Sequence, residues 1–251
     1  MEEYLSFETF SPPKEFLKKP GKYSQQGEEY VIGKLLEKFK IEKGSCCEFG
    51  AWDGKHLSNV FHLIEKGWKG VLIEGDVKKF NKFIPSLEKN YNVTCIPKFV
   101  GYNEWKPENK LDNLLAETDL PVDFDILSID VDGPDYFILR DIEVYKPKIL
   151  ILEYSPYSIG KEYVIYDPKV KIAKHKGGMS NFSAMVDMAV KKGYIPVANS
   201  MNLFCVRKDL YDKYIGLKFI DDDLDLGPKK YLSLCVEKLY PDIFPFLKKI
   251  D

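Results

Sequence analysis

Cysteine is scarce in this sequence, and its spacing suggests neither a metal site nor a disulfide framework. Five cysteines are spread over 251 residues, and only Cys46 and Cys47 lie close together. The absence of a CxxC spacing argues against a structural zinc site, and the odd count argues against a set of disulfides. Cys46 and Cys47 fall in an expected strand, where a buried thiol acts as a small hydrophobic side chain.

Long apolar runs and an excess of one charge are also missing. No stretch approaches the ~20 apolar residues that a membrane span needs. The acidic N-terminus lacks the basic-then-apolar pattern of a secretion signal, so a cytoplasmic location is expected. The 37 Lys and Arg residues nearly balance 39 Asp and Glu residues, for a net charge of -2. Without a clustered basic face, nothing indicates nucleic acid as a partner.

The composition that remains is that of a folded soluble protein. Hydrophobic residues make up 45% and aromatic residues 14% of the chain, enough to fill a sizeable core. The length suits one large domain over residues 1–251, with two small domains as the alternative. Within it, residues 1–22 are expected to form an irregular lead-in and residues 208–251 a helical C-terminal extension.

Helical and strand patterns alternate along the first two thirds of the chain. Near-continuous apolar runs predict strands that are covered on both faces, as in a parallel sheet, and the alternation predicts right-handed βαβ units. The proline at position 85 is expected to kink or split its helix, and Ser24 is a candidate N-cap. Strands are predicted over 45–49, 70–73, 93–96, 124–129 and 148–152, and helices over 25–39, 56–66, 77–90, 111–117 and 134–142.

The last third of the chain predicts a different connection. A helix over 180–192 ends at Gly193, and strands over 194–198 and 203–207 follow. Only four residues join these two strands, which requires an antiparallel hairpin because parallel strands need a long crossover. A mostly parallel sheet of seven strands therefore finishes with an antiparallel strand, unlike an ordinary nucleotide-binding Rossmann domain.

A glycine-containing turn follows the first strand. Its sequence, Glu48-Phe-Gly50-Ala51-Trp-Asp53-Gly54, offers glycines that permit a positive φ and close approach of a ligand to the backbone. A dinucleotide fingerprint would read GxGxxG. The middle glycine is absent here, which argues against a pyrophosphate at this turn.

Four acidic residues end four of the predicted strands: Glu48, Glu74, Asp130 and Glu153. Ligands of open α/β sheets bind beyond the carboxyl ends of the strands, so these acids are expected to surround one site. Glu74 stands where an acid can accept both ribose hydroxyls of a nucleoside. As an alternative, each acid could cap a helix or pair with a lysine.

Together these motifs resemble the FkbM-type methyltransferases. The resemblance spans about residues 23–209 and is carried by segments 23–29, 48–54, 57–59, 67–76, 110–115, 124–133, 147–154 and 204–208. It implies a Rossmann-like class I methyltransferase fold with helices on both faces, S-adenosylmethionine as the donor, and O-methylation of a sugar or another small hydroxylated metabolite. Asp132 stands where the family more often has Glu, and Pro134-Asp135 where a small residue and Glu are commoner, which leaves the acceptor undefined.

The resemblance also assigns expected roles within a cofactor site. Gly50, Ala51, Asp53 and Gly54 are expected to hold the methionine part of the cofactor, Glu74 its ribose, and Asp130 its amino end or the sulfonium side. The other matched residues expected in this site are Gln25, Glu48, Asn59 and Gly75.

Methyl transfer to a hydroxyl requires alignment of the reactants and is helped by a general base. Besides Asp130, the catalytic candidates are Asp132, Glu153 and His175. A Mg²⁺ ion shared by Asp130 and Asp132 is an alternative way to bind the acceptor, although it is not favoured.

Two other interpretations stay open: a catalytically inactive binding protein on the same fold, and a nucleotide-binding Rossmann enzyme. The expected partner is a small-molecule or glycan acceptor, and the sequence does not define an oligomeric state.

Overall fold

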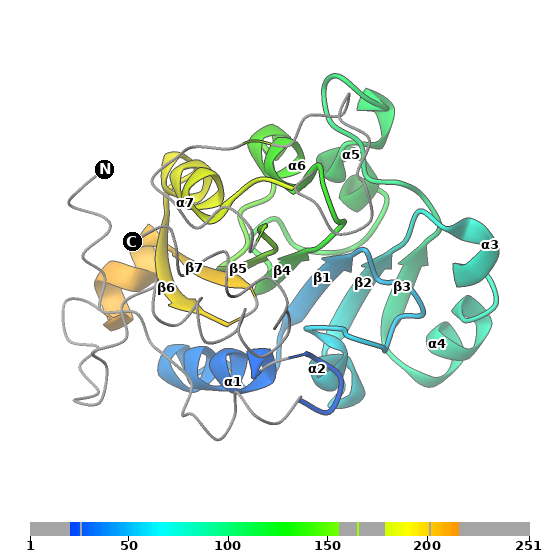
Figure 1. The fold of residues 1–251 in the computed structure, drawn as a ribbon. Coiled ribbons are helices and arrows are strands. Elements are labelled where there is room, and N and C mark those ends of the chain that lie inside the picture. Colours follow the sequence, from blue (N-terminus) through cyan, green and yellow to red (C-terminus); the bar gives the residue numbers. More distant parts are fainter. Residues whose placement is uncertain (1–20, 26, 156–164, 166–178, 201, 216–251) are drawn as a thin grey trace, which may run out of the picture.

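A computed structural model describes residues 21–25, 27–155, 165, 179–200 and 202–215 of the chain (Figure 1). A seven-stranded sheet forms its centre, with the strand order β3-β2-β1-β4-β5-β7-β6. The strands are β1 (Ser45–Phe49), β2 (Lys69–Ile73), β3 (Val93–Ile96), β4 (Ile126–Ile129), β5 (Ile149–Leu152), β6 (Tyr194–Asn199) and β7 (Leu203–Arg207).

The sheet is parallel from β3 to β5, and strand β7 reverses the pattern. Strand β7 pairs antiparallel with both β5 and β6, so it lies between two strands that run the other way. This confirms the hairpin predicted from the short link between residues 198 and 203. It also confirms the Rossmann-like class I methyltransferase fold, because a plain dinucleotide-binding sheet has the order 3-2-1-4-5-6.

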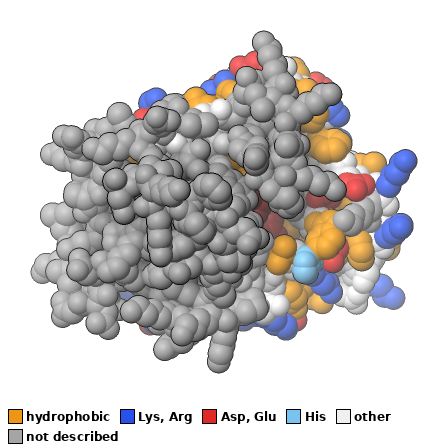
Figure 2. Space-filling view, in the orientation of Figure 1, with side chains coloured by type: hydrophobic (Ala, Val, Ile, Leu, Met, Phe, Trp, Pro, Cys, Tyr) orange, Lys and Arg blue, Asp and Glu red, His pale blue; other side chains and the backbone are white. Residues whose placement is uncertain are grey.

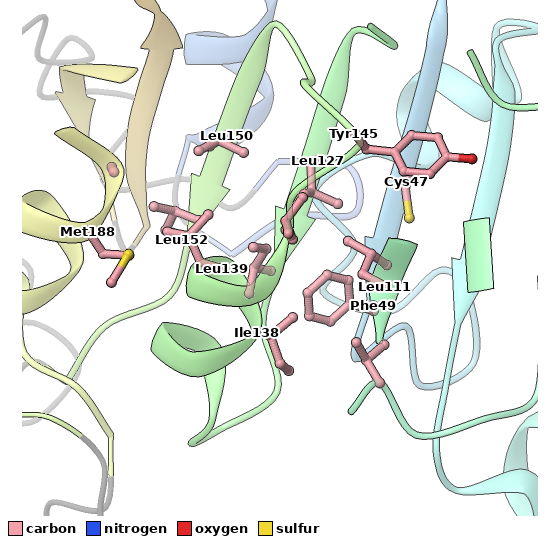
Figure 3. Close-up of a cluster of buried hydrophobic side chains, with 14 of the residues drawn as sticks. Cys47, Phe49, Leu111, Leu127, Ile138, Leu139, Tyr145, Leu150, Leu152 and Met188 are labelled. Atoms are coloured by element: carbon pink, nitrogen blue, oxygen red, sulfur yellow. The ribbon is translucent and has the colours of Figure 1, made fainter. Parts of the chain in front are cut away.

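Helices cover both faces of this sheet (Figure 1). One hydrophobic cluster joins the sheet to α1–α4, and the other joins it to α5–α7. Figure 3 shows part of the second cluster, where Phe49 and Leu127 of the sheet lie close to Leu139 of α6. The helices are α1 (Glu28–Phe39), α2 (Phe61–Glu65), α3 (Val77–Phe80), α4 (Ile84–Asn90), α5 (Leu111–Ala116), α6 (Asp135–Asp141), α7 (Phe182–Lys191) and α8 (Lys208–Leu210), with a short 3-10 helix η2 (Pro107–Asn109) and a short π-helix η3 (Tyr211–Ile215).

The helix boundaries differ from the predictions at two places, and the predicted effect of Pro85 is confirmed at a third. Helix α1 begins at Glu28 behind the left-handed Gly27, so Ser24 is not its N-cap, and no side-chain cap is present. Helix α2 has five residues instead of the eleven predicted, because Asp53 folds the preceding chain into a turn by accepting the amides of Lys55 and His56. The helix expected over 77–90 is split into α3 and α4, as predicted from Pro85, which lies in the first turn of α4, where its missing N–H is tolerated.

Several predictions fall on parts of the chain outside the described residues. These are most of the lead-in over 1–22, His175, and the extension beyond residue 215, while residues 208–215 are helical as expected. In the described part of the chain, no helix is long and apolar enough to cross a membrane.

The register of the parallel strands brings their carboxyl ends to one edge. Phe49 of β1 pairs with Ile73 of β2 and with Ile129 of β4, and Ile129 pairs with Leu152 of β5. The residues that directly follow these partners are Gly50, Glu74, Asp130 and Glu153. The sheet therefore gathers the predicted site residues before any loop contact is considered.

Gly50 allows the chain to leave β1 close to the end of β4. Its φ is 78°, and a Cβ added there would lie 1.6 Å from the carbonyl oxygen of Asp130. Only glycine avoids both the left-handed backbone strain and this collision with backbone.

We predict that Gly50→Ala destabilises the fold by about 2 kcal/mol or more, since it combines a left-handed backbone with a backbone clash. Gly33→Ala is the matched control, because Gly33 lies on the exposed side of α1 with nothing within 4 Å of an added Cβ. That change should stabilise by up to about 1 kcal/mol. Urea unfolding of both variants checks the pair, and equal stabilities would contradict the assignment of Gly50.

Candidate functional site

A cavity of about 610 Å³ opens at the carboxyl edge of the sheet. Its walls come from the loops after β1, β2, β3, β4 and β5, and one further residue, Gln25, comes from the segment before α1. The predicted site residues that line it are Gln25, Glu48, Gly50, Ala51, Glu74, Gly75, Asp130, Asp132 and Glu153.

Three predicted cofactor residues do not line this cavity. Asp53 holds the turn before α2, and a Cβ on Gly54 would meet Leu87 of α4 at 2.7 Å. Asn59 is buried between its amide contact to Glu48 and its side-chain contact to Ser128. These residues shape the loop around the cavity rather than its surface.

Glu74 joins the two loops that form one wall. One carboxylate oxygen accepts the amide of Trp52 at 2.7 Å, and the other accepts the amide of Asp76 at 2.7 Å. Each carboxylate oxygen can accept more than one hydrogen bond, so this group can still receive ligand hydroxyls. Its place beside Gly75 leaves it at the surface of the cavity.

Glu48 lies deeper, at 4% exposure. Its side chain accepts the amide of Asn59 at 2.7 Å and the hydroxyl of Ser58. Burial raises the pKa of Glu48 to about 7, against the lowering effect of these hydrogen bonds. Through these hydrogen bonds to Ser58 and Asn59, Glu48 fixes the loop between β1 and α2.

Three further carboxylates converge beyond β4 and β5. Asp130 and Glu153 are half-buried and Asp132 is exposed, and oxygen atoms of the three lie within 4.8 Å of one another. Burial, then the charge of Asp135, raises the pKa of Asp130 to about 7. Burial and the charge of Asp130 raise the pKa of Glu153 well above its usual range. The pair therefore retains a proton at a pH where ordinary carboxyls have lost theirs.

Asp135 shapes the loop that carries this cluster. It is buried, and its carboxylate accepts the amides of Val131 at 3.0 Å and Gly133 at 2.9 Å. Between them, Asp132 has a φ of 56° and donates its amide to Glu153 at 3.2 Å. Asp135 therefore supplies the acceptor for the loop amides around Asp132.

The mouth of the cavity is aromatic, which the sequence analysis missed. Trp52, Leu57, Phe99 and Trp105 line it with large exposed surfaces, and Figure 2 shows hydrophobic, histidine and acidic side chains together on the right of this face. Phe99 packs against Gly75, where an added Cβ would lie 2.0 Å from its ring. The only sequence signal for this wall was the aromatic spacing in the segment 99–105.

His56 is a second lining residue that the sequence analysis did not select. Its ring lies edge-on to Trp52, with 4.6 Å between the ring centroids. The histidine that was selected, His175, lies outside the described residues. His56 could have been found only by recognising that residues 50–58 form one loop over the site.

The cavity fits the cofactor that the family resemblance implies. A glycine cradle at Gly50, a carboxylate at the end of β2 and apolar rings beside Gly75 match the needs of an amino acid part, a ribose and a base. The three carboxylates beyond β4 and β5 would also suit Mg²⁺, which prefers oxygen ligands.

Comparisons with known proteins give distant structural similarity. No family model matches the chain, and no curated protein matches its sequence. It is similar to precorrin-6y C5,15-methyltransferase from Geobacter metallireducens, with 20% identity, a TM-score of 0.33, and coverage of 55% of this chain and 66% of that one. The chain thus spans just under two thirds of that protein.

Two further solved structures are similar over more of the chain. An S-adenosylmethionine-dependent methyltransferase from Aquifex aeolicus is 16% identical, with a TM-score of 0.40 over 72% of this chain and 89% of that one. The N-terminal domain of EvdMO1, crystallised in the presence of S-adenosylhomocysteine and D-fucose, is 13% identical, with a TM-score of 0.40 over 72% of this chain and 81% of that one.

The raised pKa of Asp130 predicts a pH-dependent cost to stability. The folded protein binds the proton on the Asp130 carboxyl more tightly than the unfolded chain does. Protonation of Asp130 therefore stabilises the fold fully below about pH 4, and this stabilisation is lost as the pH rises through about 7. Asp130→Asn removes this titrating group and its charge repulsion of Glu153. We expect the free energy of unfolding of the variant, relative to that of the wild type, to increase by about 1 kcal/mol or more as the pH rises from 5 to 8.

Urea unfolding at several pH values measures this difference. A difference between the two proteins that stays constant from pH 5 to pH 8 would show that Asp130 titrates normally.

Proposed function

We propose that this protein is an S-adenosylmethionine-dependent methyltransferase of the FkbM type that methylates a hydroxyl of a sugar or another small metabolite. The observation that carries the proposal is the position of Glu74, a carboxylate bound to the glycine-containing loop and facing the same cavity as Gly50 and Asp130. The domain is proposed to extend over residues 1–251, and the cytoplasmic location stays a prediction.

The cofactor supplies an electrophilic methyl group on a sulfonium. Gly50 and Ala51 line the part of the cavity proposed for its methionine part, and Glu74 is proposed to accept the ribose hydroxyls. Phe99 and Trp105 offer apolar surface for the nucleobase of the cofactor, and their ring centroids are 5.9 Å apart. Asp130 and Glu153 together hold negative charge beside the position proposed for the sulfonium and amino group.

Asp132 is the base that we favour among the described candidates. It is exposed at the cavity, where an acceptor hydroxyl can reach it. Glu153 suits this role less well, since burial and neighbouring charges favour its protonated form. A protonated Glu153 instead acts as a hydrogen-bond donor within the cluster.

The alternatives have distinct consequences. A nucleotide-binding Rossmann enzyme would bind NAD⁺, which the missing GxGxxG and the antiparallel β7 argue against. An inactive binding protein would bind S-adenosylhomocysteine without turnover of the donor on any acceptor. A shared Mg²⁺ would make methyl transfer sensitive to a chelator, whereas our proposal needs no metal.

We predict that Glu74→Ala weakens S-adenosylhomocysteine binding roughly 10- to 100-fold, because charge-assisted hydrogen bonds to the ribose are lost. Isothermal titration calorimetry measures the affinity, with NAD⁺ as the negative control. Glu37→Ala is the matched variant, since Glu37 pairs with Lys34 on the exposed side of α1. Unchanged affinity in Glu74→Ala would exclude the ribose assignment.

We also expect Asp132→Asn to lower kcat by roughly 10²- to 10⁴-fold, the range for loss of a general base. Affinity for S-adenosylhomocysteine should stay as in the wild type. The measurement uses labelled donor and an acceptor found by screening small hydroxylated compounds. A variant with full turnover would move the base to another residue.

A further inference from the structure

Gln25 reaches the cavity from a part of the chain that the sheet does not position. All other described lining residues belong to β1 or β2 or to the loops that follow β1–β5, whereas Gln25 precedes α1. Its side chain is exposed, so it has no packing role that explains its place at the cavity wall. Its position depends on what holds the segment 21–25.

The chain before Gln25 is fastened to two helices. Tyr23 packs edge-on against Phe61 of α2, with ring centroids 4.9 Å apart, and its hydroxyl donates to Glu65 at 2.9 Å. The carboxylate of Glu29 in α1 accepts the amides of Tyr23 at 2.6 Å and Ser24 at 3.1 Å. These charge-assisted bonds to backbone fix the path of the chain directly before Gln25.

The chain after Gln25 is fastened as well. Glu28 is fully buried and accepts the hydroxyl of Ser200 at 2.7 Å, which joins α1 to the hairpin between β6 and β7. Gly27 turns the chain into α1 with a φ of 81°. Gln25 is thus held between two anchors that lie within four residues of it.

The polar surface of the cavity shows what such a side chain contributes. Five carboxylates line it, from Glu48, Glu74, Asp130, Asp132 and Glu153, against the single lysine Lys98, which pairs with Glu117 at 3.3 Å. Ser58, another neutral lining group, already donates to Glu48. A ligand carboxylate in this cavity would be repelled by the acids and needs hydrogen-bond donors, which the amide of Gln25 supplies.

We propose that the side-chain amide of Gln25 donates to the α-carboxylate of the cofactor's methionine part, and that Glu29 is the positioning residue that holds Gln25 there. This inference rests on the proposed function, since it assumes that S-adenosylmethionine occupies the cavity. It assigns to the N-terminal segment the recognition of the amino acid part, separate from the ribose contact of Glu74.

Two ligands separate this inference from the proposed function. S-adenosylhomocysteine carries the amino acid part, while 5′-methylthioadenosine has the same nucleoside and sulfur but no carboxylate. Calorimetry on the full-length Gln25→Ala variant should show roughly 10- to 100-fold weaker binding of the first ligand, as expected for loss of a hydrogen bond to a charged group. Binding of the second ligand should be unchanged.

Glu29→Ala tests the positioning role. It should weaken the binding of S-adenosylhomocysteine but not that of 5′-methylthioadenosine. Adding Gln25→Ala to it should cause little further loss of affinity, because both changes remove the same contact. Lys22→Ala is the control, since its exposed ion pair with Glu65 contributes little.

The outcomes are distinct. Suppose that the wild type binds both ligands. If Gln25→Ala then weakens the binding of both equally, or of neither, this inference is overturned and the proposed function stands. If the wild type binds neither ligand, the inference and the proposed function are both overturned.

Discussion

Carboxylates that accept backbone amides organise the loops around this cavity. Glu48 holds the loop before α2, Glu74 joins the loops after β1 and β2, Asp135 holds the loop after β4, and Glu29 holds the segment before α1. Loop amides would otherwise lack partners at the edge of the sheet, and the carboxylates of Glu74, Asp135 and Glu29 each accept two of them. The same arrangement concentrates negative charge at one place, and this charge adds to the effect of burial in raising the pKa of Asp130 to about 7.

This constraint links the fold to the proposed chemistry. The parallel register alone places Gly50, Glu74, Asp130 and Glu153 at one edge, and the loop contacts then decide which of their atoms face the cavity. Acids that only support loops and acids that face a ligand are therefore of the same residue type. A cationic sulfonium and an amino group suit such a site, whereas a carboxylate needs a neutral or basic donor brought from elsewhere in the chain.

The sequence predicted the sheet well because its strands are short apolar runs that end at charged residues, and because a four-residue link forces an antiparallel hairpin. It could not predict that α2 begins at Phe61, because the turn held by Asp53 overrides a helical pattern. Nor could it separate Asp53, Gly54 and Asn59, which shape the loop, from Gly50 and Ala51, which line the cavity. Phe99, Trp105 and His56 were missed because their role depends on contacts between distant loops.

The most direct test of this account is calorimetric titration of the purified protein with S-adenosylhomocysteine, with NAD⁺ as the control ligand. The account predicts one site with micromolar affinity for S-adenosylhomocysteine and no heat of binding with NAD⁺, an affinity typical of a preformed nucleoside pocket (roughly −8 kcal/mol). Binding of NAD⁺ in place of S-adenosylhomocysteine would contradict it, and would make the cavity a dinucleotide site.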